Sequence, residues 1–233
     1  MKSMLLCLFI TFLTYSATAQ NKINVDANQG GDIEKAFSRD VKMLFPEFKG
    51  ALVYLKGSRT QALMNLNILS GKLMFVDKNN DTLALANEQD VVLVAFDDRK
   101  FIPTFKGFVE MIANAEDTIL GLKTSLHHVG NKKYGAYGMQ ANTSAIDNIN
   151  TVETSYVKHG DINTLAKAGF DKKKLFYIVI GKRCQIANQG AFLKVFAKKK
   201  NQIKEYLQQN SVDFSKEEDL VRLFNFCITN KNP

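Results

Sequence analysis

The residues that could carry nucleophilic or acid–base chemistry are few in this chain of 233 residues. Histidine occurs only at His127, His128 and His159. Neighbouring residues of a strand belong to opposite faces of a sheet, so the adjacent pair is badly placed to share a metal ion. No serine-nucleophile elbow, zinc-protease motif, Cys-x-x-Cys pair or phosphate-binding loop accompanies them. We therefore predict no catalytic residue, with a histidine-dependent hydrolase as the alternative.

One acidic segment nearly matches the calcium-binding loop of an EF-hand. Asp77, Asn79, Asp81 and Glu88 supply oxygen atoms at positions 1, 3, 5 and 12 of such a loop. The sixth position needs glycine for a sharp turn, and here it is Thr82, whose branched side chain disfavours a positive φ. The residues on either side alternate as in strands. We predict a polar hairpin turn, and we expect neither a metal ion nor another cofactor in the chain.

Cys184 and Cys227 are the cysteines that would remain after an N-terminal export signal is removed. An exported protein can form disulfides, and a bond between these two would join the last helix to a strand. The alternative is a pair of buried thiols that pack as small apolar groups.

Positive charge is concentrated in one part of the chain, whose formal net charge is +8. Residues 167–204 contain eleven Lys or Arg and a single acid, Asp171. Such a field attracts anionic surfaces, although it also fits a plain solvated face. Evenly interleaved aromatic residues are missing, so we do not expect nucleic acid to bind. Lys198, Lys199 and Lys200 are the candidate ligand-binding cations.

Residues 131–150 are polar and rich in Gly, Asn and Ser, which predicts a long loop. Tyr134 and Tyr137 lie within it and are further candidates for ligand contact. The chain also has 17 Phe, which could line an apolar cavity or simply fill the core of the fold.

The elements that position these residues are mostly strands. After Pro46 the apolar residues recur with a period of two, and turn residues recur about every ten positions, as in an antiparallel meander. Gly181-Lys182 suits a tight hairpin. The predicted strands are 51–55, 62–68, 73–76, 82–86, 91–96, 101–105, 108–113, 118–127, 152–157, 175–180 and 183–187.

Helical spacing is confined to the two ends of the chain. Apolar residues in 32–44 predict a short N-terminal helix that Pro46 ends. A second helix is expected over 191–208, with a break near Ala197. Ser215 and Glu218 form a capping box that opens a last helix, whose apolar stripe includes Leu220 and Cys227.

These elements predict an α+β fold, mainly an antiparallel β meander of about ten short strands in a curled sheet with C-terminal helices. We expect an N-terminal segment, partly helical, at 20–45 and the β domain at 46–187. A helical pair packed on the sheet follows at 188–228. An apolar fraction of 45% is typical of an ordinary globular protein.

The first residues resemble a cleavable export signal. Lys2 is followed by eleven uncharged residues at 4–14 and by Ala17-Thr18-Ala19, which favours cleavage after Ala19. The apolar run is about half of the roughly 20 residues that a membrane-spanning helix needs. We therefore expect a signal peptide at 1–19, no transmembrane segment, and a protein that is periplasmic or secreted.

Three stretches of the chain, at 45–50, 64–86 and 192–221, resemble a family of small exported proteins of Gram-negative bacteria with no assigned activity. They begin with Phe45-Pro-Glu-Phe, Met64-Asn-Leu-Asn and Phe192-Leu-Lys-Val. The resemblance implies a location in the cell envelope and a β-rich fold. It implies no activity and no binding residue.

Together these features predict an exported, non-enzymatic binding or interaction protein. Its expected partner is an envelope protein, an anionic surface or an apolar small molecule. The alternatives are the envelope hydrolase and a carrier that holds an apolar ligand inside a curled sheet.

Overall fold

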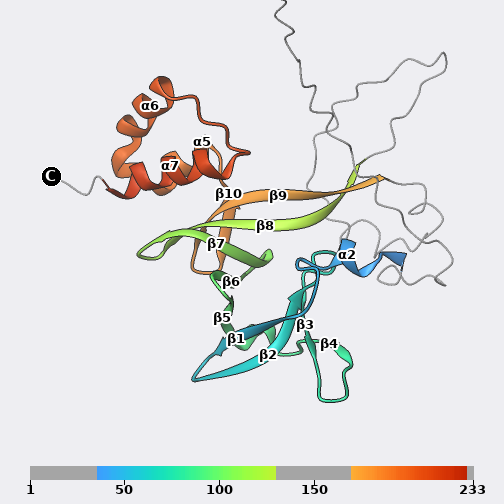
Figure 1. Ribbon diagram of the computed structural model, residues 1–233. Coiled ribbons are helices and arrows are strands. Elements are labelled where there is room, and N and C mark those ends of the chain that lie inside the picture. The colour runs from blue at the N-terminus through green and yellow to red at the C-terminus, as the bar shows by residue number, and fades with distance from the viewer. Residues whose placement is uncertain (1–35, 130–168, 230–233) are drawn as a thin grey trace, which may run out of the picture.

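The computed structural model describes residues 36–129 and 169–229, and the main element in them is one antiparallel sheet of ten strands (Figure 1). The strands are β1 (Lys49–Leu55), β2 (Ser58–Leu66), β3 (Leu73–Val76), β4 (Thr82–Ala84), β5 (Val91–Phe96), β6 (Arg99–Thr104), β7 (Gly107–Ala115), β8 (Thr118–Val129), β9 (Gly169–Ile180) and β10 (Arg183–Ile186). The α+β fold with a β meander is thereby confirmed.

The spatial order of the strands departs from a simple meander at one place. The order is β10-β9-β8-β7-β6-β5-β1-β2-β3-β4, so β5 pairs with β1 instead of β4. The chain returns across three strands between β4 and β5, through a short 3₁₀ turn, η1 (Glu88–Asp90). The sheet is open, with β10 and β4 at its two edges.

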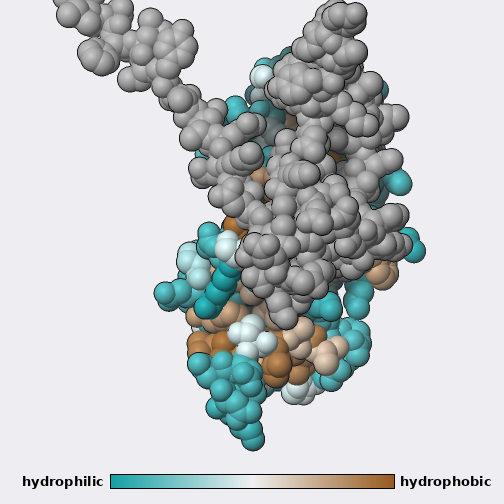
Figure 2. All heavy atoms as spheres, turned by 90° about the vertical axis from the view of Figure 1, so that its right-hand side faces the viewer, coloured by the Kyte–Doolittle hydropathy of each residue, from teal (hydrophilic) through white to brown (hydrophobic). Residues whose placement is uncertain are grey.

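Two apolar cores lie along this sheet. The first joins β1, β2, β3, β5 and β6 with Phe37 and Phe45 of the N-terminal segment. The second lies between β7–β9 and the C-terminal helices, which Figure 1 shows stacked beside that end of the sheet. Leu63 of β2 and Leu83 of β4 are exposed. Figure 2 shows hydrophobic surface in the lower part of the molecule, above a hydrophilic tip.

The C-terminal helices are α5 (Gln189–Val195), η2 (Ala197–Lys199), α6 (Lys200–Gln209) and α7 (Glu217–Thr229). The predicted break near Ala197 is present, because α5 gives way there to the 3₁₀ turn. The predicted capping box of the last helix is wrong. The Ser215 hydroxyl donates to Asp213, and the Asp219 carboxylate reaches back to accept the Asp213 N–H at 2.8 Å.

The N-terminal helix predicted for 32–44 is reduced, within the described residues, to the four-residue α2 (Arg39–Lys42). Met43 then pairs with Asn67, and the Leu44 N–H donates to the Leu66 carbonyl. Beyond α2 the chain therefore runs beside β2 as an extra pairing segment, which helical spacing alone did not indicate.

Asn65 of β2 is fully buried, although it alternates with apolar residues along the predicted strand 62–68, a pattern that would place it on a polar face. Pro46 interrupts the pairing between the N-terminal segment and β2, because proline has no N–H to donate. The Asn65 amide fills this gap: it accepts from the Phe45 N–H at 3.1 Å and donates to the Phe45 and Glu47 carbonyls at 2.9 and 3.1 Å.

Two predicted turns are confirmed. Residues 77–81 join β3 to β4, and the Asp77 carboxylate accepts the N–H groups of Asn79 and Asp81. Gly181 and Lys182 connect β9 to β10 in a two-residue hairpin, with a φ of +60° at Gly181. No helix among the described residues is long and apolar enough to cross a membrane. The predicted strand at 152–157 and the loop at 131–150 lie outside the described residues.

Candidate functional site

A cavity of about 500 Å³ lies between the β8–β10 part of the sheet and the turn that joins β2 to β3. Its size is within the roughly 300–1,000 Å³ typical of small-molecule sites. Residues far apart in the sequence form its walls. They are Ser70, Gly71 and Lys72 of the β2–β3 turn, Glu88 of η1, Phe105, Lys106 and Gly107 at the β6–β7 turn, and Lys123, Ser125, Leu175, Tyr177, Cys184 and Ile186 of β8, β9 and β10.

Alternation along the strands places the residues of the sheet wall. Phe176 and Ile178 of β9 pack in the helix-covered core, whereas Tyr177 and Val179 belong to a smaller cluster on the other face. Tyr177 pairs with Gly121 of β8. A Cβ atom at Gly121 would lie 2.3 Å from Cγ1 of Val109, so glycine is required at that position for β7 and β8 to pack.

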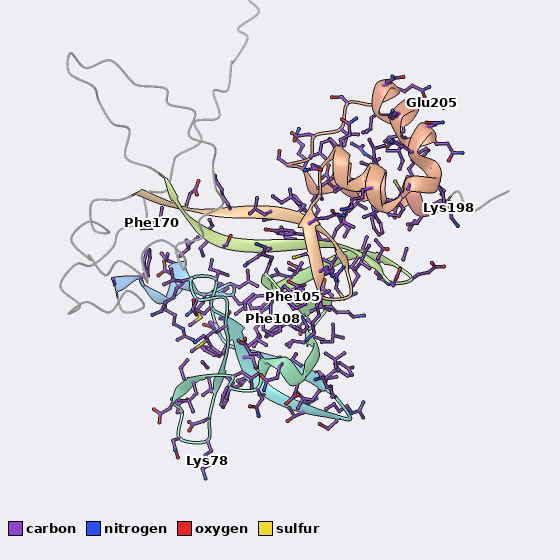
Figure 3. The ribbon with its side chains drawn as sticks, turned by 180° about the vertical axis from the view of Figure 1, so that it is seen from behind. Lys78, Phe105, Phe108, Phe170, Lys198 and Glu205 are labelled. Carbon is purple, nitrogen blue, oxygen red and sulfur yellow. The ribbon has the colours of Figure 1, made fainter. Side chains whose placement is uncertain are left out.

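The turn between β6 and β7 closes another side of the cavity. The Phe105 N–H donates to the Lys182 carbonyl at 3.0 Å, which ties this turn to the β9–β10 hairpin. The Thr104 hydroxyl donates to the Gly107 carbonyl at 2.7 Å. Phe105 itself is 74% exposed, and Figure 3 shows it beside that hairpin.

The charge of the cavity wall is mainly positive. Lys72 and Lys106 are exposed, and neither ammonium group forms an ion pair with a described residue. Lys123 is half-buried and donates to the Lys106 carbonyl. Glu88 is the only acidic residue among the lining residues, and its Oε1 accepts the Leu73 N–H at 2.9 Å. The wall thus has three cations against one anion.

Two hydroxyl groups of the same wall have no partner among the described residues. Tyr177 is only 5% exposed, and its hydroxyl forms no hydrogen bond there. Burial, with a smaller contribution from Cys184, raises the pKa of Tyr177, so the phenol stays protonated and able to donate. The Oγ atom of Ser70 is likewise buried without a partner. Ser125 is a third buried hydroxyl residue lining the cavity.

Cys184 and Cys227 are both free thiols, so the disulfide is not formed in the structure. Cys184 packs with Tyr177 and Val109, whereas Cys227 packs in the core between the sheet and the helices. The Cys184 thiol donates to the Thr104 hydroxyl over 3.7 Å. Burial raises the pKa of Cys227 to about 12, which leaves it a neutral thiol.

The lysines predicted for ligand binding do not line this cavity. Lys198 and Lys199 lie instead beside a second hollow of about 720 Å³, with Val195 and Phe196. The Lys199 ammonium donates to the Cys227 carbonyl at 2.6 Å, near the C-terminus of α7, where a cation is favourable. Lys200 is exposed at the start of α6. Lys199 therefore has a structural role.

The remaining candidates are dispersed or undescribed. Tyr134, Tyr137 and His159 lie outside the described residues. In the β8–β9 pairing, His127 lies opposite Asp171 and His128 opposite Phe170. No group of three or more potential metal ligands occurs in the parts of the chain that the structure describes.

The residues that do line the cavity were missed by sequence reasoning. Lys72 and Lys106 each lie next to a glycine between two predicted strands, and Tyr177 lies in a predicted strand, so the individual elements were visible. The return of β5 to the far side of β1 was not visible, and it is this topology that sets the overall order of the sheet.

No protein-family model matches the chain, and no curated protein or solved structure matches it. What the cavity can do is therefore argued from its own geometry and charge.

Proposed function

We propose that this protein is an exported, non-enzymatic binding protein that holds a small anionic molecule in the cavity between β8–β10 and the β2–β3 turn. The observation that carries the proposal is the lining itself: three lysines against one carboxylate around about 500 Å³. A concave site of one charge sign raises the local concentration of the opposite ion.

Lys72 and Lys106 suit an anion because their charges are not used in ion pairs with described residues. Lys72 and Lys106 form no ion pair with a described residue, so a ligand carboxylate or phosphate can take that place. The carboxylate of Glu88 is held by a backbone N–H on its own side of the cavity, which lowers its competition with the ligand. The apolar side chains of Leu175 and Ile186 limit the space open to water.

A binding role is favoured over catalysis by the surroundings of the potential nucleophile. An activated thiol needs an adjacent base or cation that stabilises the thiolate. The hydrogen-bond partner of Cys184 in the structure is the neutral hydroxyl of Thr104. The site therefore has cations that can hold an anion, and its one thiol has a neutral hydroxyl, not a base, as its hydrogen-bond partner.

The proposal is tested first by native mass spectrometry of the mature protein purified from its own cell envelope, with a solvent extract analysed in parallel. We expect a co-purifying acidic molecule, and an N-terminus at Gln20 if export follows the predicted cleavage. A chain retained in the cytoplasm with its first 19 residues intact would contradict export.

Two pairs of variants then locate the binding. Lys72→Met with Lys106→Met should weaken binding of the acidic molecule by at least about tenfold, since each removes a charged hydrogen-bond donor. The matched control is Lys198→Met with Lys200→Met, which removes the same charge from the helices. Equal losses in both pairs would mean general attraction to a basic protein and would refute the cavity as the site.

A further inference from the structure

Two hydroxyl groups that line the cavity indicate the chemical class of the ligand more closely than the positive charge of the lining does. Tyr177 and Ser70 both line the cavity, one from β9 and one from the β2–β3 turn. The Oγ atom of Ser70 is buried without a partner among the described residues. Tyr177 is only 5% exposed, and its hydroxyl forms no hydrogen bond with a described residue. Polar groups in such surroundings usually find a partner, so these two hydroxyls around one cavity call for an explanation.

A hydrocarbon ligand would leave these hydroxyls as they are. An unpaired buried polar group is costly, and filling the cavity with apolar atoms would remove any access to water. A ligand that carries hydroxyl groups can both donate to and accept from Tyr177 and Ser70. The wall is therefore complementary to a polar ligand body, whatever its charged group is.

The lining residues differ in exposure. Lys72 and Lys106 are exposed, whereas Tyr177 is only 5% exposed. The exposed ring of Phe105, next to Lys106, adds an apolar surface to the lining. A ligand whose anionic group binds the exposed lysines would have its hydroxyl groups left to contact the less exposed part of the lining, which includes Tyr177.

Building on the proposed function, we propose that the ligand is a polyhydroxylated anion of the sugar-acid class and that Tyr177 determines its specificity by hydrogen-bonding a ligand hydroxyl. A site that hydrogen-bonds a hydroxyl discriminates strongly against an analogue without one, because the buried protein group then stays unpaired. Tyr177 is a recognition residue here, and the lysines supply the affinity for charge.

The test compares six-carbon carboxylates that differ in their hydroxyl groups. Binding of D-glucuronate, D-gluconate and hexanoate to the mature full-length protein is measured by isothermal titration calorimetry. We expect at least one hydroxylated compound to bind at least about tenfold more tightly than hexanoate. Tyr177→Phe should reduce that preference by about tenfold while leaving the affinity for hexanoate unchanged, since one hydrogen bond is lost and no charge is altered.

A matched control is Tyr206→Phe, because Tyr206 stacks on Phe226 in the helices, away from the cavity. It should bind all three compounds as the unaltered protein does, and the melting temperatures of both variants show whether they fold. Equal affinity for hexanoate and the hydroxylated compounds would overturn this inference but leave the proposed anion site in place. An unchanged preference in Tyr177→Phe would overturn the role proposed for Tyr177. Binding of none of the three carboxylates, together with no acidic molecule in the native mass spectrum, would overturn the proposed function as well.

Discussion

Two buried polar regions of this protein differ in how their hydrogen bonds are arranged. At the Pro46 junction, the amide of Asn65 bonds to Phe45 and Glu47 and also accepts the Leu66 N–H at 2.8 Å. In the cavity wall, the hydroxyls of Tyr177 and Ser70 bond to no described residue. The first region satisfies its own polar groups, and the second leaves them available.

The difference has a backbone origin. Around Pro46 the chain leaves the regular pairing of the sheet, so backbone groups of residues 45–47 need a side chain to pair with them. Tyr177 lies in the middle of a long strand, where the backbone is paired with Gly121 of β8. Its hydroxyl is therefore not needed to pair backbone groups, and the comparison predicts that the two regions respond differently to substitution.

The largest effect is expected for Asn65→Ala. The change leaves the buried N–H and carbonyl of Phe45, and the part-buried carbonyl of Glu47, without their partner. Each buried group left unsatisfied costs roughly 1–3 kcal/mol. We expect the free energy of unfolding to fall by about 3 kcal/mol in urea denaturation, with an unchanged m-value. Asn114→Ala, at an exposed position of β7, is the matched control and should change stability by less than about 0.5 kcal/mol. A similar small loss for Asn65→Ala would break the comparison.

Cys227 adds to the comparison a third buried group, a thiol in an apolar core, whose effect on stability depends on pH. Its pKa is raised from the ordinary 9.0 to about 12, because burial opposes the thiolate. The Cys227 thiol ionises above pH 9 in the unfolded chain but stays neutral in the folded one. Its contribution to the free energy of unfolding is therefore complete below pH 9 and is lost as the pH rises towards 12. At pH 10 the loss due to this thiol is about 1.4 kcal/mol.

Urea denaturation at pH 7 and pH 10 checks this effect. Cys227→Ala should lose about 1.4 kcal/mol less than the unaltered protein between the two pH values, although it is less stable at both. An identical pH dependence in the two proteins would show that the thiol ionises freely in the folded state.

Lys199→Met is expected to have a smaller effect. The variant loses the 2.6 Å bond from the ammonium to the Cys227 carbonyl but keeps most of the apolar stem. Because cations near a helix C-terminus stabilise it modestly, we expect a loss of about 1 kcal/mol. Lys198→Met is the neighbouring control and should have no measurable effect on stability. Neither change should alter ligand affinity. A loss of affinity in both variants would show that the ligand binds at the C-terminal helices and not in the cavity.

These cases show what the sequence contained and what it did not. Strands 73–76 and 91–96 were predicted with their observed bounds, since each is a short apolar run between clear turn residues. The hairpin at Gly181 was predicted for the same reason. These features are local, so periodicity and turn residues were sufficient to define them.

The features that failed depend on contacts between distant segments. Asn65 looked like a solvent-facing residue because its pairing with Phe45 spans 20 positions. The cavity joins residues from 70 to 186, and which lysines face it depends on the strand order. Charge density along the chain pointed to Lys198, Lys199 and Lys200. These residues are neighbours in the sequence, but none of them lines the cavity.

The smallest expected effect on stability tests the comparison most directly. Tyr177→Phe removes a hydroxyl that forms no bond with a described residue, so without ligand we expect the free energy of unfolding to stay within about 0.5 kcal/mol. The change is nearly isosteric and leaves the packing with Val109 and Val179 in place. Urea denaturation of the ligand-free protein measures it. A loss of 2 kcal/mol would mean that the hydroxyl serves the fold, as Asn65 does, whereas unchanged stability combined with weaker binding would identify a group kept for the ligand alone.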